Sequence, residues 1–180
     1  VPPTLAPVPA RSPAGRRARA AGARESLRHL WPIYATVVAL AVVMMMNTAQ
    51  LSFLLADNGI VNPARQAEVM QMGSIMATVG SFLYGVLGPR LDARWNYTMI
   101  ALALGSGAVT DGFSHTPFVA GVGTALVGLG AGYLGPHFGR LVLARASASA
   151  RGRAVGLNFS ATYFGDLLNP FVVRPLAAAF

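Results

Sequence analysis

Long apolar runs separated by short polar links make up the chain from Trp31 onward. A helix that crosses a membrane needs roughly 20 residues at 1.5 Å rise per residue, and five runs reach or nearly reach that length. They cover 31–55, 69–88, 96–113, 117–144 and 154–173. Buried helices of a water-soluble protein would give similar runs, but not five in close succession. The pattern predicts an all-α, polytopic membrane protein with about five transmembrane helices.

Polar and small residues gather on one face of two of these predicted helices. In 69–88 that face spans an arc of about 80° at 100° per residue, and it carries Gln71, Ser74, Thr78, Ser81 and Gly85. In 154–173 the arc is about 100°, and it carries Asn158, Thr162, Gly165, Asp166 and Asn169. Such stripes have two interpretations: they line a polar cavity, or they join helices by hydrogen bonds worth about 0.6–2 kcal/mol each.

The first and third runs differ in their polar content. Asn47 and Gln50 share a face in the second half of the first run, which ends at Leu55. The third run has almost no polar interior apart from Ser106 and Thr110. An apolar surface of this kind predicts a helix at the periphery of the bundle, facing lipid.

Asp166 is the most costly residue within an apolar run. A carboxylate near the middle of a bilayer costs about 2.5–3.5 kcal/mol on insertion scales, so it is expected to face the bundle interior or water. Asn158, Thr162 and Asn169 lie on the same arc, and their side chains can hydrogen-bond to either protonation state of the acid. Asp166 is therefore a candidate for binding solute or for gaining and losing a proton.

The segment Gly130–Gly135, GAGYLG, matches the G-x-G-x-x-G pattern of dinucleotide-binding proteins. That motif works only after a strand, at the start of a helix, with an acid about 20 residues further on. Here it lies inside an apolar run, so no cofactor is expected. Close helix packing at Gly128, Gly132 and Gly135 is the better interpretation, and Pro136 predicts a bend in the same helix.

Composition removes several classes of function. The chain is 54% hydrophobic and 11% charged, with a net charge of +8, no Cys and only Arg among its 14 Lys and Arg residues. Thiolate metal sites, Walker A loops and Schiff-base lysines are thereby excluded. The histidines are scattered, so no metal site is expected. The basic residues lie in the links and form no basic domain, which argues against nucleic acid.

The arginines also predict an orientation. Residues 1–29 hold six Arg and five Pro, which is typical of a flexible arm; a targeting leader is the competing interpretation. The link between the second and third runs has two Arg and the region around the fourth link has four, whereas the alternate links have only Arg65 and Arg174. Because Arg accumulates on the cytoplasmic side, we expect the arm to be cytoplasmic. We expect the protein to be a multi-pass protein of the bacterial inner (plasma) membrane.

From Trp31 to about residue 176 the succession resembles the C-terminal half of a major facilitator superfamily transporter. The Arg-rich arm looks like the loop that joins the two halves, and Gly85, Asp92 and Arg94 look like a shortened form of the family's loop motif. The segment Gly128–Pro170 resembles the tenth helix, the following Arg-Gly-Arg loop and the eleventh helix. The resemblance implies a fragment that lacks its last helix and the N-terminal half.

The resemblance implies a secondary transporter, not an enzyme, that moves a small solute across the bilayer, with protons as a candidate coupling ion. The candidate pathway residues are Asp166, Asn158, Thr162, Asn169, Asn47, Gln50, Gln71 and Arg140. The helices that match the first, second, fourth and fifth runs would line the central cavity. A membrane scaffold or receptor without transport is one alternative, and a membrane-embedded enzyme is another.

Overall fold

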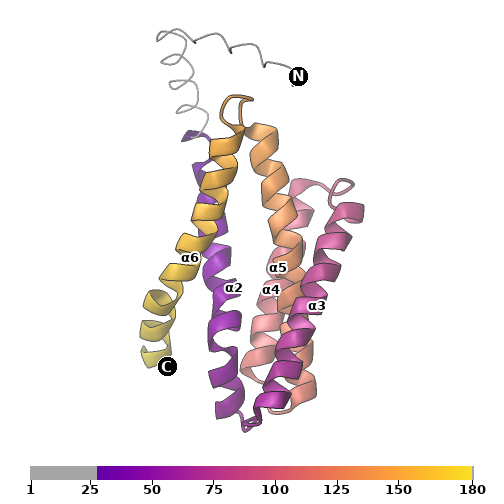
Figure 1. The fold of residues 1–180 in the computed structure, drawn as a ribbon, viewed down its shortest axis with the longest axis vertical. Coiled ribbons are helices and arrows are strands. Elements are labelled where there is room, and N and C mark those ends of the chain that lie inside the picture. Colours follow the sequence, from indigo (N-terminus) through magenta and orange to yellow (C-terminus); the bar gives the residue numbers. More distant parts are fainter. Residues whose placement is uncertain (1–27, 180) are drawn as a thin grey trace, which may run out of the picture.

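The computed structural model describes residues 28–179, and within them the chain forms five α-helices and no strand (Figure 1). The helices are α2 (Trp31–Asp57), α3 (Pro63–Leu87), α4 (Ala93–Gly112), α5 (Pro117–Arg145) and α6 (Arg151–Ala179). Each predicted apolar run lies within or largely within one helix. α3, α4 and α6 begin before the predicted bounds because their first turns are polar, and α2, α5 and α6 end after them. Residues 1–27 of the predicted arm lie outside the described residues.

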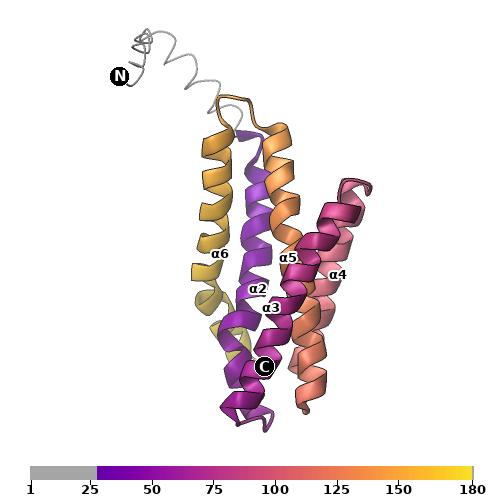
Figure 2. The same cartoon turned by 45° about the vertical axis from the view of Figure 1, so that its right-hand side comes forward.

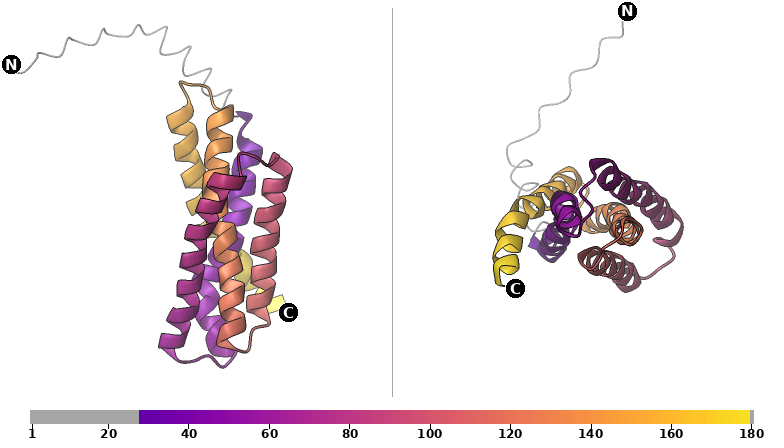
Figure 3. Two further views of the ribbon diagram at one scale, coloured as in Figure 1. Left: turned by 90° about the vertical axis from the view of Figure 1, so that its right-hand side faces the viewer. Right: turned by 90° about the horizontal axis from the view of Figure 1, so that it is seen from below.

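Two helices organise the bundle. α3 and α4 pack mainly on α5, and α6 packs mainly on α2. Figure 2 shows successive helices running in opposite directions, and the view from below in Figure 3 shows α5 between α3 and α4. α2 and α5 also contact each other, which joins the two groups. α4 therefore lies at one flank, in agreement with the peripheral position expected from its sequence.

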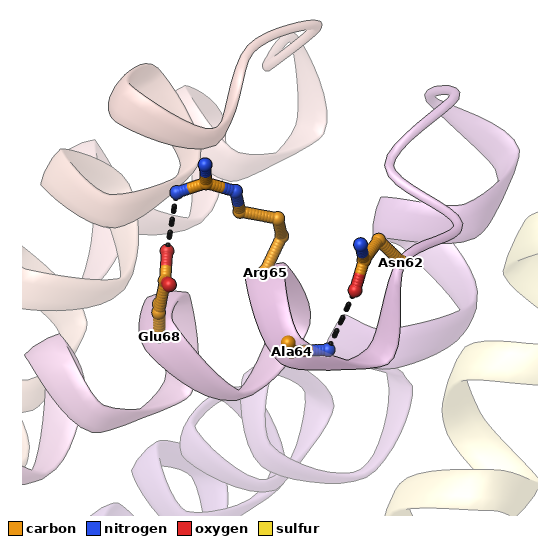
Figure 4. Close-up of polar contacts among 4 residues, drawn as sticks. All are labelled: Asn62, Ala64, Arg65 and Glu68. Carbon is orange, nitrogen blue, oxygen red and sulfur yellow. Dashed lines mark hydrogen bonds and ion pairs between the residues drawn. The ribbon is translucent and has the colours of Figure 1, made fainter.

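The helix starts follow from short local signals. Asn62 precedes α3, and its Oδ1 accepts a hydrogen bond of 2.9 Å from the amide of Ala64 (Figure 4). One turn on, Arg65 and Glu68 form an exposed ion pair of 2.8 Å. Thr116 caps α5 in the same way as Asn62 caps α3, by accepting from a first-turn amide. These caps satisfy amides that the helix itself leaves without acceptors.

Three of the helices are long and apolar enough to cross a membrane: α2, α3 and α5. The surface of the bundle is also apolar. Large side chains that are at least two-thirds exposed include Phe53, Phe82, Phe118 and Phe171. A water-soluble protein rarely leaves so many large apolar side chains uncovered. The chain is accordingly an all-helical protein with the features of a membrane protein.

Glycines allow α3 and α5 to approach closely. A Cβ added at Gly128 would overlap the backbone carbonyl of Gly73, and one at Gly132 would overlap that of Ala77. Both positions match the packing role expected from the sequence. The expectation is wrong for Gly135, because nothing lies within 4 Å of a Cβ placed there. Gly135 lies about one helical turn after Gly132, on an exposed part of α5.

Pro136 lies inside α5, where it cannot donate the hydrogen bond that the carbonyl of Gly132 would otherwise accept. The hydroxyl of Ser81, on α3, donates to that carbonyl at 2.8 Å. A polar side chain of a neighbouring helix thus replaces the missing amide, which is how membrane helices tolerate proline. Ser81 belongs to the polar stripe noted in the sequence, and here it acts in helix packing.

Candidate solute site between α2, α4 and α6

A buried acid joins three helices. Asp111, in the last turn of α4, is only 2% exposed. Its carboxylate accepts hydrogen bonds from the amide of Asn47, on α2, and from the hydroxyl of Thr124, on α5, at 3.3 Å. Gly123 provides the space for this arrangement, because a Cβ there would overlap the carboxylate. A buried carboxylate requires such partners in an apolar surrounding.

A second polar junction lies between α2 and α6. The side-chain amide of Asn169 donates to the backbone carbonyl of Val42 at 2.8 Å, and its Oδ1 accepts from Gln50 at 3.3 Å. Asn169 is 2% exposed. Gly165 lies one turn earlier, where a Cβ would be 2.6 Å from the Val38 carbonyl oxygen. This face of α6 therefore packs closely on α2 at Gly165, and the hydrogen bonds of Asn169 hold the two helices together.

A cavity of about 790 Å³ lies between α2, α4 and α6. Its volume falls in the range of roughly 300–1,000 Å³ that is usual for small-molecule sites. The polar lining residues are Asn47, Gln50, Asp57, Asp111, Asp166 and Asn169. Met45, Met46 and Phe53 are among the apolar ones, and no basic side chain in the described part of the chain lines it. An apolar cavity with a few convergent polar groups can bind and orient a small solute.

Asp166 is the acid with unused hydrogen-bonding capacity in this cavity. It is half-buried on α6, and its Oδ1 is buried without a hydrogen-bond partner among the described residues. Asp111, in contrast, has both Asn47 and Thr124 as donors. Asp166 can therefore accept a hydrogen bond from a solute or carry a proton without breaking an existing contact.

A smaller cavity of about 330 Å³ lies beside the larger one, between α2, α3 and α5. Asn47 lines both cavities, Thr124 lines the smaller one and Asp111 the larger. The hydrogen-bonded set Asn47–Asp111–Thr124 is thus a polar partition between the two. A change in this set would alter both cavities at once.

The structure brings together only some of the residues singled out in the sequence. Asn47, Gln50, Asp166 and Asn169 line the larger cavity, but Asn158 and Thr162 do not. The hydroxyl of Thr162 donates to the backbone carbonyl of Asn158 at 3.1 Å. The Oδ1 of Asn158 is buried and has no partner among the described residues.

The remaining candidates lie elsewhere on the bundle. Gln71 and Thr78 are exposed on the surface of α3, and Ser74 lines the smaller cavity. Arg140 is exposed near the opposite end of the bundle, where it lines a different cavity. The residues of the presumed loop motif also lie at that end. They are Gly85, which has nothing within 4 Å of a Cβ, Asp92, which precedes α4, and Arg94, which is exposed.

Asp111 and Thr124 are the site residues that the sequence interpretation missed. The polar residues noted in the third run are Ser106, which is exposed, and Thr110, which is half-buried, and their hydroxyls donate to carbonyls of their own helix, those of Leu102 and Ser106. A signal did exist. The buried residues of α4 recur at helical spacing, and they are Asn96, Ile100, Leu104, Gly107 and Asp111.

In residues 28–179 no group of three or more His, Cys, Asp or Glu side chains is placed to hold a metal ion. Comparison with known protein families, with characterised proteins and with solved structures gives no match. The function is therefore argued from the cavity and the helix arrangement.

Proposed function

We propose that the chain is part of a secondary transporter of the major facilitator type, which moves a small solute by alternating access. In this proposal all five helices cross the membrane, the arm before α2 is cytoplasmic, and the membrane is the plasma membrane. The N-terminal half and a last helix would complete the transporter. The solute would bind in the cavity between α2, α4 and α6. This differs from the arrangement that the resemblance implies, in which the first, second, fourth and fifth runs line the central cavity and the third run does not.

The observation that carries the proposal is the pair of acids Asp111 and Asp166 in one cavity of an apolar helix bundle. Placing an acid within a membrane helix costs free energy, and acids at such positions typically mark the pathways of ions, protons or substrates. A scaffold or receptor would need helix contacts but no acid with a free oxygen, such as Asp166 has. A membrane-embedded hydrolase or transferase would need a metal or a group of acids near an interface.

The way in which the helices pair gives further support. α2, α3 and α4 form one triplet in chain order, and α5 and α6 begin a second. The second helix of each triplet packs on the first helix of the other: α3 on α5, and α6 on α2. Such an exchange is expected when two triplets are related by inverted repeats, as they are within each half of a major facilitator transporter.

Within this proposal the residues have separate roles. Asp166 binds the proton or contacts the solute, because its Oδ1 is free to accept a hydrogen bond. Asn169 and Gln50 hold α6 against α2 beside it. Asp111 and Asn47 keep the partition to the neighbouring cavity closed. Glycine contacts between α3 and α5 would allow these helices to move as one unit.

The proposal is tested by proton-coupled uptake in proteoliposomes that contain the complete transporter and a pH-sensitive dye. A library of small solutes is screened for solute-dependent proton flux. Asp166→Asn keeps the shape and most of the hydrogen bonding of the side chain, so the variant should bind solute but lose at least about 90% of pH-driven accumulation. Glu68→Gln is the matched control, because Glu68 is exposed near the start of α3, pairs with the exposed Arg65 and does not line this cavity. Equal accumulation by the Asp166 variant and the wild type would remove coupling from this residue, and a screen without flux from any solute would contradict transport.

A further inference from the structure

A third cavity lies at the end of the bundle where α3 meets α4, and the proposed solute pathway does not use it. Its volume is about 180 Å³, enough for roughly six water molecules at about 30 Å³ each. This is below the usual range for drug-sized ligands. Among its lining residues are Tyr84 of α3, Asn96 of α4, and His137 and Arg140 of α5.

Two side chains that line this cavity, those of His137 and Arg140, have nitrogen atoms without a polar partner among the described residues. His137 is only 4% exposed, and its Nε2 has no hydrogen-bond partner among the described residues. Tyr84, Tyr97 and Phe138 surround its ring edge to face at centroid distances of 5.0–5.8 Å. Arg140 is one helical turn away and forms no ion pair within residues 28–179. A buried imidazole without a partner is costly unless a ligand completes it.

The beginning of α4 adds backbone donors to the same cavity. Ala93, the first residue of α4, lines it. Asp92 precedes the helix but makes no side-chain capping bond, and the amides of Ala93 and Arg94 have no acceptor in the described part of the chain. Free amides at a helix N-terminus, together with the helix dipole, favour an anion. The exposed side chain of Asp92 is the opposing charge at this point.

The surrounding loop is held in one conformation. The side-chain amide of Asn96 donates to the carbonyls of Gly88, Leu91 and Asp92 at 3.1–3.2 Å. Its Oδ1 accepts from the hydroxyl of Tyr133. Asn96 thus uses both of its amide hydrogens within the loop and accepts from α5 through its Oδ1, so it acts by fixing the loop against α5. The shape of the cavity and the direction of the α4 amides are therefore set before any ligand binds.

We propose that this cavity binds a phosphate group. Arg140 supplies the charge, the first amides of α4 donate to the phosphate oxygens, and His137 donates from the buried side through Nε2. Arg–phosphate contacts and helix N-termini are recurrent partners of this chemistry. The exposed Arg90 and Arg94 lie in the same loop region and add positive charge. The phosphate comes from a lipid headgroup or from free phosphate in solution.

The tryptophans of this chain provide a direct assay. Trp95 is in the first turn of α4, and Trp31, at the start of α2, is the only other tryptophan. In the Trp31→Phe background of this chain, the fluorescence of Trp95 therefore reports on the first turn of α4, which includes the lining residue Ala93. The protein is kept in dodecyl maltoside, which has no phosphate, and is titrated with phosphatidylglycerol or with inorganic phosphate. Digalactosyl diacylglycerol is the phosphate-free lipid control, and sodium chloride matches the ionic strength.

We expect a saturable change in Trp95 fluorescence with one phosphate source. Saturation with phosphatidylglycerol but not with inorganic phosphate identifies the headgroup, and saturation with inorganic phosphate identifies the free anion. Arg140→Gln should weaken binding at least tenfold, and His137→Phe, which keeps the ring packing, should weaken it several-fold. Arg151→Gln removes the same charge from the start of α6 and should leave binding unchanged.

Three results would overturn the proposal. These are no saturation with either phosphate source, equal saturation with the galactolipid, and unchanged binding in both the Arg140 and the His137 variants. Far-UV circular dichroism of each variant establishes that it is folded. Because Arg140 is exposed, its replacement leaves the packing of the bundle intact, so loss of binding in that variant reports on the cavity.

Discussion

Thr110 and Thr124 carry the same hydroxyl and use it differently. Thr110, half-buried on α4, donates at 2.8 Å to the carbonyl of Ser106 in its own helix. Thr124, buried on α5, donates to the carboxylate of Asp111 on the neighbouring helix. A hydroxyl that bonds within its helix adds little to the contact between helices. A hydroxyl that satisfies a buried carboxylate on another helix stabilises that contact.

We therefore expect Thr124→Val to lower the free energy of unfolding by about 1–3 kcal/mol, because it removes a donor from a buried carboxylate. Thr110→Val is the matched control, and its effect should stay within about 0.5 kcal/mol. The measurement is unfolding by SDS titration in mixed micelles. Equal effects of the two substitutions would show that the Asp111 contact adds nothing to stability.

At this scale the sequence singled out some of the residues that line the larger cavity and missed others, for a physical reason. Asp166, Asn169, Asn47 and Gln50 were found because polar residues within apolar runs are costly wherever they point. The sequence did not indicate Asp111 as a site residue because it lies near the end of a run. At such a position a carboxylate costs little free energy if water reaches it. The burial of Asp111 depends on Asn47 and Thr124, which come from two other helices. A single-helix pattern does not contain that information.

At the scale of the elements, Pro136 and Ser81 form a pair across the contact between α3 and α5. The proline removes a donor from the carbonyl of Gly132, and the serine replaces it at 2.8 Å. The proline and the polar stripe are each visible in the sequence, but separately. The sequence could not relate them, because the register between α3 and α5 is fixed by the contacts of Gly128 with Gly73 and of Gly132 with Ala77.

A double-mutant cycle tests this pairing. Ser81→Ala should lower the free energy of unfolding by about 1–2 kcal/mol, because the carbonyl of Gly132 is then left without a donor. Pro136→Ala restores the backbone amide, so Ser81→Ala in that background should cost less than about 0.5 kcal/mol. SDS titration of the four proteins gives the coupling energy. A coupling energy near zero would mean that the hydroxyl does not stand in for the missing amide.

The five helices were predictable because their apolar runs are long. The start of α3 was not, because Asn62 and Pro63 begin this helix in a polar segment that precedes the predicted run 69–88. α4 and α6 are the two for which composition alone does not establish a membrane span, since only α2, α3 and α5 are long and apolar enough. The arrangement of the bundle bears on this point. α4 runs antiparallel to α5 along their contact (Figure 3), and its 20 residues are about 30 Å long, the thickness of the hydrocarbon core.

Whether the membrane is crossed five or three times has a sharp test, because the chain has no native Cys. Single cysteines are placed in three links, at exposed Val61, His115 and Ser149, and are labelled with an impermeant maleimide in right-side-out vesicles. With five spans and a cytoplasmic arm, Val61→Cys and His115→Cys react from outside and Ser149→Cys does not, because α4 and α5 each return the chain across the bilayer. With only α2, α3 and α5 across, Ser149→Cys would react together with Val61→Cys, and His115→Cys would be protected. We expect the five-span result, since the Arg-rich links would then all lie on the cytoplasmic side, and labelling of Ser149→Cys from outside would contradict it.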